Sequence, residues 1–147
     1  MYFVDRKKIE KTLSYMETTL RHFPNIEQAD TLTNQLAIER LASVTIESII
    51  DVGNSMIDGF IMRDPGGYED IIDILEDEKV VNNGHALALK RVIQERKQLV
   101  QQFYEVDHKR LVEVFKANQE ALLQFPIEVR RYLETELGPV SAFLPED

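Results

Sequence analysis

Residues 86–107 read ALALKRVIQERKQLVQQFYEVD, and this stretch decides how the rest of the chain can be arranged. On a helix, its apolar residues recur every three or four positions and form one stripe, made of Leu89, Val92, Ile93, Leu99, Val100 and Phe103. Arg96 falls inside this stripe, seven residues from both Leu89 and Phe103. A guanidinium keeps its charge and is costly to bury alone. The stretch therefore predicts an amphipathic helix whose arginine meets an acid, an anion or water.

Spacing alone leaves two interpretations of Arg96 open. In the first, the side chain snorkels or pairs with a carboxylate of a neighbouring helix. In the second, it points into a polar groove made for phosphate. An open cleft beside a symmetry mate would support the groove, whereas contact with Glu47, Asp51 or Asp58 would support the pairing. Asp51, Asn54 and Asp58 recur at three- and four-residue spacing, so these three are the predicted partners.

The composition fits one globular domain. The chain has 147 residues, of which 44% are hydrophobic and 29% are charged. We expect a single helical domain over residues 1–138 and an irregular tail over 139–147. Because cysteine is absent, a disulfide framework, a thiolate nucleophile and a cysteine-ligated metal site are all excluded.

Charge and hydropathy restrict the partners. No signal peptide is recognisable, and no uncharged apolar run approaches the roughly 18 residues needed to cross a bilayer. We therefore expect a cytoplasmic protein that does not engage a membrane. The net charge of −9 argues against broad non-specific binding of nucleic acid, which depends on neutralising phosphates. Lys90, Arg91, Arg96 and Lys97 nevertheless give the 86–107 stretch a local positive charge, which allows one anion site.

Helical periodicity covers most of the remaining chain. The segments that show it span residues 2–22, 31–62, 68–75 and 107–137. The 31–62 segment is apolar on more than one side, which is typical of a helix buried against several neighbours. Pro126 falls inside the last segment, where we expect a kink or a short restart. No segment alternates with period two, so we predict an all-α, up-and-down bundle of four long helices and one short helix.

Familiar catalytic and metal motifs are missing. There is no Gly-x-Ser-x-Gly elbow, and Gly66-Gly67 lacks the Lys-Ser/Thr of a phosphate loop. Helical bundles hold metals through two Glu-x-x-His motifs, but only Glu105–His108 has that spacing, and it falls at a helix boundary. We therefore predict no metal and no cofactor. His22, His85 and His108 are interpreted as ordinary surface residues.

The run from Arg96 to Phe103, RKQLVQQF, resembles the signature of HepT-like proteins, a branch of the HEPN superfamily. In that family the pattern reads Arg, often Asn, any residue, Leu, Val, His, any residue, Tyr. The likeness extends over residues 31–137 and includes DPGGYEDIIDIL at 64–75, with residues 1–23 matching the family's first helix. It implies an all-helical homodimer in which the Arg-x4-His motifs of two protomers face each other across a groove.

The resemblance also implies an activity and partners. HepT-like proteins are metal-independent ribonucleases, often toxins paired with a minimal nucleotidyltransferase antitoxin, MntA, that adenylylates the motif tyrosine. In this chain Gln101 occupies the histidine position and Phe103 the tyrosine position. Tyr104 comes one residue late, which on a helix turns it by about 100°. Glutamine can hydrogen-bond phosphate but cannot shuttle a proton near neutral pH.

These departures lead to two functional hypotheses. The first is a protein of ribonuclease-toxin ancestry whose activity is weak or absent. It would retain RNA or nucleotide binding through Arg96, with Lys97, Tyr104 and the predicted partners of Arg96 nearby. The second is a non-enzymatic structural or regulatory homodimer in which Arg96 is a paired interface residue.

Overall fold

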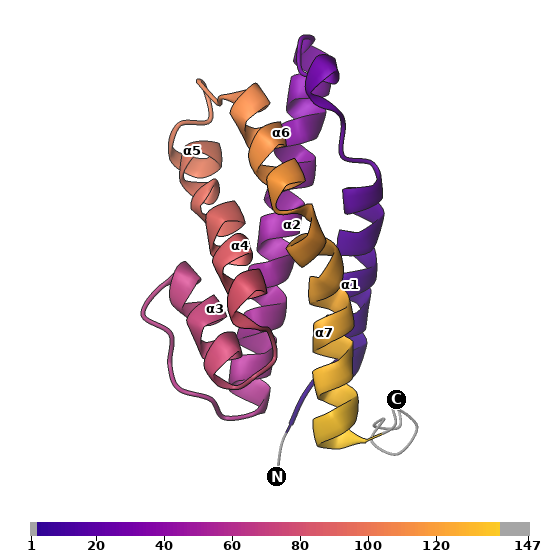
Figure 1. Ribbon diagram of the computed structural model, residues 1–147, viewed down its shortest axis with the longest axis vertical. Helices are drawn as coiled ribbons and strands as arrows, with labels where there is room; N and C mark the ends of the chain where they lie inside the picture. The colour runs from indigo at the N-terminus through magenta and orange to yellow at the C-terminus, as the bar shows by residue number, and fades with distance from the viewer. Residues whose placement is uncertain (1–2, 139–147) are drawn as a thin grey trace.

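Helix α2 (Leu32–Gly59) runs through the middle of the molecule and packs against α1, α3, α5 and α6 (Figure 1). The other elements are α1 (Arg6–Arg21), the 3₁₀ turn η1 (Ile26–Gln28), α3 (Tyr68–Asp77), α4 (Asn83–Gln94), α5 (Arg96–Gln101), α6 (His108–Ala117) and α7 (Gln119–Leu137). This computed structural model describes residues 3–138, so the predicted irregular tail lies outside the described residues. Within them every regular element is helical, which confirms the predicted all-α fold.

The central position of α2 follows from its sequence. Thr31 caps its first turn by accepting a hydrogen bond from the backbone N–H of Asn34 at 3.2 Å. Fully buried residues then occupy several of its faces: Ile38, Ala42, Ile46, Ile49 and Met56. A Cβ at Gly53 would overlap the Cγ2 atom of Ile71, so the missing side chain lets α3 approach closely.

Two of the predicted long helices are broken. The first break is at Glu95, between α4 and α5, and α5 then ends at Gln101 instead of reaching residue 107. Glu95 is buried, accepts a hydrogen bond from Gln98 Nε2 at 3.0 Å, and lies 3.6 Å from an Nη of Arg110. A buried carboxylate needs such partners, and Glu95 finds them at the single residue that separates α4 from α5. Asp107 then caps α6, as its position before the last helix predicted.

The second break shows that the helix does not restart at Pro126. Helix α7 continues through that proline, and the interruption falls at Asn118, between α6 and α7. The Asn118 side chain donates to the carbonyl of Val114 at 2.8 Å, and the same carbonyl also accepts the backbone N–H of Asn118 at 3.1 Å. Proline removes one backbone hydrogen bond, whereas Leu122, Phe125 and Val129 are all buried around it. That packing outweighs the missing bond.

An ion-pair cluster joins the first and last helices of the bundle. Arg130 of α7 donates to both carboxylate oxygens of Glu10 and of Glu17 on α1, at 2.8–3.0 Å. Figure 1 shows α1 and α7 side by side along their length. No helix in residues 3–138 is long and apolar enough to cross a membrane.

Candidate functional site

Arg96 opens α5, and two other helices hold its side chain. Its Nε donates to Glu47 Oε1 of α2 at 2.8 Å, and its guanidinium carbon lies 4.4 Å from the centre of the Tyr68 ring at the start of α3. The hydrogen bond to Glu47 raises the pKa of Arg96 further above its already high value. The side chain remains 29% exposed. As predicted, Arg96 is therefore partly buried and meets an acid.

The acid that meets Arg96 is not one of the three predicted partners. Asp51 and Asp58 are exposed and Asn54 is half-buried further along α2, whereas the contact falls on Glu47. The position at which α5 packs against α2 decides which acid is within reach, and no pattern in the 86–107 stretch indicated that position. Sequence reasoning named Glu47 only as one possible contact, and it missed Tyr68 entirely. Tyr68 directly follows Gly66-Gly67, and nothing in that local sequence indicated that its ring contacts Arg96.

A hollow of about 400 Å³ opens beside the guanidinium, between the start of α3 and the α4–α5 limb. Its lining consists of Tyr68, Glu69, Ile93, Gln94, Arg96, Lys97, Val100 and Gln101. Arg96 and Gln101, the motif arginine and the residue at the histidine position, thus border the same space. The bond to Glu47 uses only Nε, so both Nη groups of Arg96 have no partner among the described residues. Their N–H groups can therefore donate to another molecule, while the single charge of the guanidinium is paired with Glu47.

Phe103 and Tyr104 lie outside this hollow. Both belong to the turn that follows α5, where they are 66% and 74% exposed, and their rings pack edge to face with centroids 5.5 Å apart. The expectation that helical phase turns Tyr104 away is therefore wrong, because the helix has already ended at Gln101. The turn conformation alone sets where the two rings point.

The histidines differ from their interpretation as surface residues. His108 Nε2 pairs with Glu39 of α2 at 2.7 Å, and His85 Nδ1 pairs with Glu128 of α7. Both imidazoles are largely buried, while His22 is exposed. Partners distant in sequence explain why local patterns did not reveal these pairs. In residues 3–138, no three His, Asp or Glu side chains gather in a way that could hold a metal ion.

Comparison with known proteins gives consistent matches over nearly the whole chain. The family described as "Ribonuclease HepT-like" matches residues 7–129. A Bacillus subtilis (strain 168) protein named "Putative RNase YutE" is 54% identical over 143 residues, which cover 97% of this chain and 99% of that protein. A solved structure entitled "Structure of Cytosolic Protein of Unknown Function YutE from Bacillus subtilis" superposes with a TM-score of 0.92. It is 54% identical, with 97% of this chain and 100% of that chain covered.

Proposed function

The chain belongs to the HepT-like ribonuclease family, and from this premise we propose that its Arg96 hollow binds RNA phosphate while cleaving RNA weakly or not at all. One observation carries the proposal: Arg96 and Gln101 border one hollow, and among the described residues no hydrogen bond is made by either Nη group of Arg96. A guanidinium recognises phosphate through paired N–H donors, and Glu47 and Tyr68 restrict the rotamers of this one.

The weak cleavage follows from the chemistry of Gln101. Cleavage of RNA needs a proton to leave the attacking hydroxyl and another to reach the departing oxygen. A positioned acid–base group contributes typically about 10²- to 10⁴-fold to such a reaction. The amide of Gln101 can hold a phosphate oxygen but has no proton to exchange near neutral pH. We therefore expect this chain to bind RNA but to cleave it weakly or not at all.

We further propose that the active form is a homodimer whose two hollows lie close together. Val100 at the edge of the hollow is 53% exposed, and Phe103 and Tyr104 next to it are more exposed still. In a symmetric pair, the same apolar surface on both copies is covered at once. Light scattering at micromolar concentration should give twice the 17.1 kDa mass of the chain. A monomer at that concentration would refute the dimer.

Restoring the histidine tests the proposed site. The Gln101→His variant should cleave unstructured RNA in the presence of EDTA faster than the wild type, by a factor approaching about 10². Gln102→His is the matched control, because Gln102 is adjacent and exposed but does not line the hollow. Adding Arg96→Ala to the Gln101→His variant should remove the gain. The double variant with Phe103→Tyr completes the family motif, although Phe103 does not line the hollow.

Binding is measured separately from cleavage. Fluorescence anisotropy with a labelled single-stranded RNA should show binding to the wild type, weakened roughly tenfold in Arg96→Ala through loss of one charged contact. Robust cleavage by the wild type that persists in Arg96→Ala would show that the active site is elsewhere. An inert Gln101→His variant that is still folded, and wild-type protein that fails to bind RNA, would together reject the proposal.

A second candidate function is a non-enzymatic structural or regulatory homodimer. The pairing of Arg96 with Glu47 favours it, since contact with an acid of α2 is what that reading requires. The Glu47→Gln variant distinguishes the two functions, because it removes the carboxylate that pairs with Arg96. It should strengthen RNA binding if the hollow is a binding site, and weaken the dimer without effect on RNA if Arg96 is structural.

A minimal nucleotidyltransferase is a further proposed partner. Phe103 offers no hydroxyl for adenylylation, so in this chain the acceptor would be Tyr104, whose side chain is exposed beside it. Incubation with a nucleotidyltransferase of this class and ATP should increase the mass of the wild type by one or more AMP units. Tyr104→Phe should prevent the increase.

A further inference from the structure

The hollow beside Arg96 is larger than a phosphate needs. Its volume of about 400 Å³ lies within the range of sites that enclose a whole small molecule. Three apolar side chains belong to its lining, namely Tyr68, Ile93 and Val100. Tyr68 and Val100 are 47% and 53% exposed, so their surfaces remain open to a ligand. A phosphate makes no use of such a surface, whereas an unpaired nucleobase packs on aromatic rings and apolar side chains.

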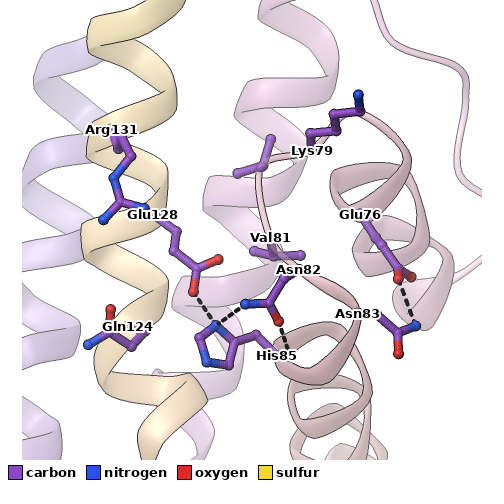
Figure 2. Close-up of a pocket in the computed structure, with 10 residues that line it drawn as sticks. Glu76, Lys79, Val81, Asn82, Asn83, His85, Gln124, Glu128 and Arg131 are labelled. Carbon is purple, nitrogen blue, oxygen red and sulfur yellow. Dashed lines mark hydrogen bonds and ion pairs between the residues drawn. The ribbon is translucent and has the colours of Figure 1, made fainter.

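The larger hollow at the other end of α4 offers no comparable surface. It has a volume of about 650 Å³ and lies between the α3–α4 connection and α7 (Figure 2). No aromatic side chain is among the described residues that line it. Its cations, Lys79 and Arg131, are balanced by the carboxylates of Glu76 and Glu128. Neither charge nor an apolar ring therefore favours RNA in that hollow.

Two hydrogen-bond acceptors complete the lining of the Arg96 hollow. Glu69 in the first turn of α3 and Gln94 at the end of α4 both line it, and Gln94 Nε2 donates to Glu69 Oε1 at 3.2 Å. Among the described residues, neither Glu69 Oε2 nor Gln94 Oε1 accepts a hydrogen bond. Lys90 also attracts Glu69, but it forms its ion pair with Asp73 at 2.8 Å. Two acceptors, on residues joined by one hydrogen bond, are thus open to donors of a ligand.

Guanine is the RNA base that matches two acceptors. On its Watson–Crick edge, N1–H and the N2 amino group are donors side by side, whereas adenine, cytosine and uracil each place a single donor next to an acceptor. An ionised carboxylate only accepts hydrogen bonds, so it pairs with guanine and repels the acceptors of the other three bases. The negative charge of Glu69 also opposes a phosphate in the same hollow, and a base with two donors offsets that opposition best.

Given the proposed binding of RNA phosphate by Arg96, on which this inference rests, we propose that the hollow selects guanine in single-stranded RNA. Arg96 contacts the phosphate, and the ring of Tyr68 packs against the base. Glu69, with the carbonyl of Gln94 beside it, accepts hydrogen bonds from N1–H and from the N2 amino group. Glu69 is therefore a specificity-determining residue. It does not contact the Arg96 side chain, which Glu47 and Tyr68 hold.

Fluorescence anisotropy with four labelled RNAs tests this selection on the full chain. All four RNAs are short, single-stranded and uridine-rich, and they carry G, A, C or U at one central position. The wild type should bind the G-containing RNA roughly tenfold more tightly than the other three, as expected for a base read by two hydrogen bonds. Glu69→Gln should remove most of this preference, because the amide carries no charge and can donate as well as accept.

Glu76→Gln is the matched control. Glu76 lies on the same helix as Glu69 and also accepts from a side-chain amide, that of Asn83 at 2.9 Å, but it lines the other hollow (Figure 2). This variant should keep the wild-type preference for G. Arg96→Ala should weaken the binding of all four RNAs by a similar factor, because it removes a phosphate contact and no base contact. Since Glu69 is exposed, Glu69→Gln should retain the wild-type circular dichroism spectrum.

The results that would overturn guanine selection differ from those that would overturn RNA binding. Equal affinity of the wild type for the four RNAs, or a preference for G that Glu69→Gln retains, would refute the selection and leave the proposed RNA site in place. A preference lost equally in Glu76→Gln would show that the base is not read in the Arg96 hollow. Failure of all four RNAs to bind the wild type would refute the proposed function, and the guanine selection with it.

Discussion

Replacing Arg130 with methionine should lower the free energy of unfolding by about 2 kcal/mol. The substitution keeps a long apolar stem but removes hydrogen bonds to two carboxylates of α1. Hydrogen bonds to charged groups contribute roughly 1.5–3 kcal/mol each when buried, and exposed ion pairs roughly 0–1 kcal/mol. Arg130 is 33% exposed, and its partners Glu10 and Glu17 are 54% and 31% exposed, so we take a value between the two limits.

Thermal unfolding followed by circular dichroism measures this change directly. For a domain of this size, about 2 kcal/mol corresponds to a fall in Tm of roughly 4–8 °C. Arg131→Met is the matched control, because Arg131 is the next residue and has no partner among the described residues. It should change the free energy of unfolding by less than about 0.5 kcal/mol. Equal shifts for the two variants would show that the ion-pair cluster contributes no stability.

The pH dependence of the free energy of unfolding, compared between the wild type and Arg130→Met, tests whether the ion pairs cause the difference in stability. The hydrogen bond from Arg130 is the largest cause that lowers the pKa of Glu17 from its ordinary value of 4.5. A carboxyl whose pKa is lowered on folding stabilises the protein above its unfolded pKa and loses that contribution as the pH falls. The difference between wild type and Arg130→Met should therefore be complete at pH 7 and shrink below about pH 4.5. A difference that is constant down to pH 3 would contradict the electrostatic explanation.

Two further predictions concern other contacts. Gly53→Ala should lower the free energy of unfolding by about 1 kcal/mol, because the overlap of the new Cβ with Ile71 costs more than the gain in helix propensity. Gly84→Ala is the matched control, since a Cβ there has no atom closer than 3.6 Å, and it should raise the free energy of unfolding by about 0.5 kcal/mol. Urea titrations measure both changes. The guanidinium of Arg63 and the Gly66 N–H lower the pKa of Asp70 to about 2, so wild-type protein should lose stability between pH 4 and pH 2 more steeply than Asp70→Asn. Parallel acid curves would contradict this.

The sequence by itself determined the all-helical class and the central place of the 31–62 segment. Apolar spacing of three and four residues requires a helix with one or more buried sides, and that requirement is local. The capping role of Asp107 was likewise readable, because a cap depends on its own neighbours. The motif pattern located Arg96 and Gln101, which the fold places on one hollow.

Only the tertiary structure decided where the helices are interrupted and which residues the polar side chains contact. The interruptions at Glu95 and Asn118 leave the apolar stripe intact, so periodicity passes over them, while Pro126 looks like a break and is not one. Arg96 contacts Glu47 instead of Asp51 because of the position at which α5 packs against α2. His85 pairs with Glu128, 43 residues away. Contacts between distant residues depend on how helices are positioned to within a fraction of a turn, and local sequence patterns do not carry that information.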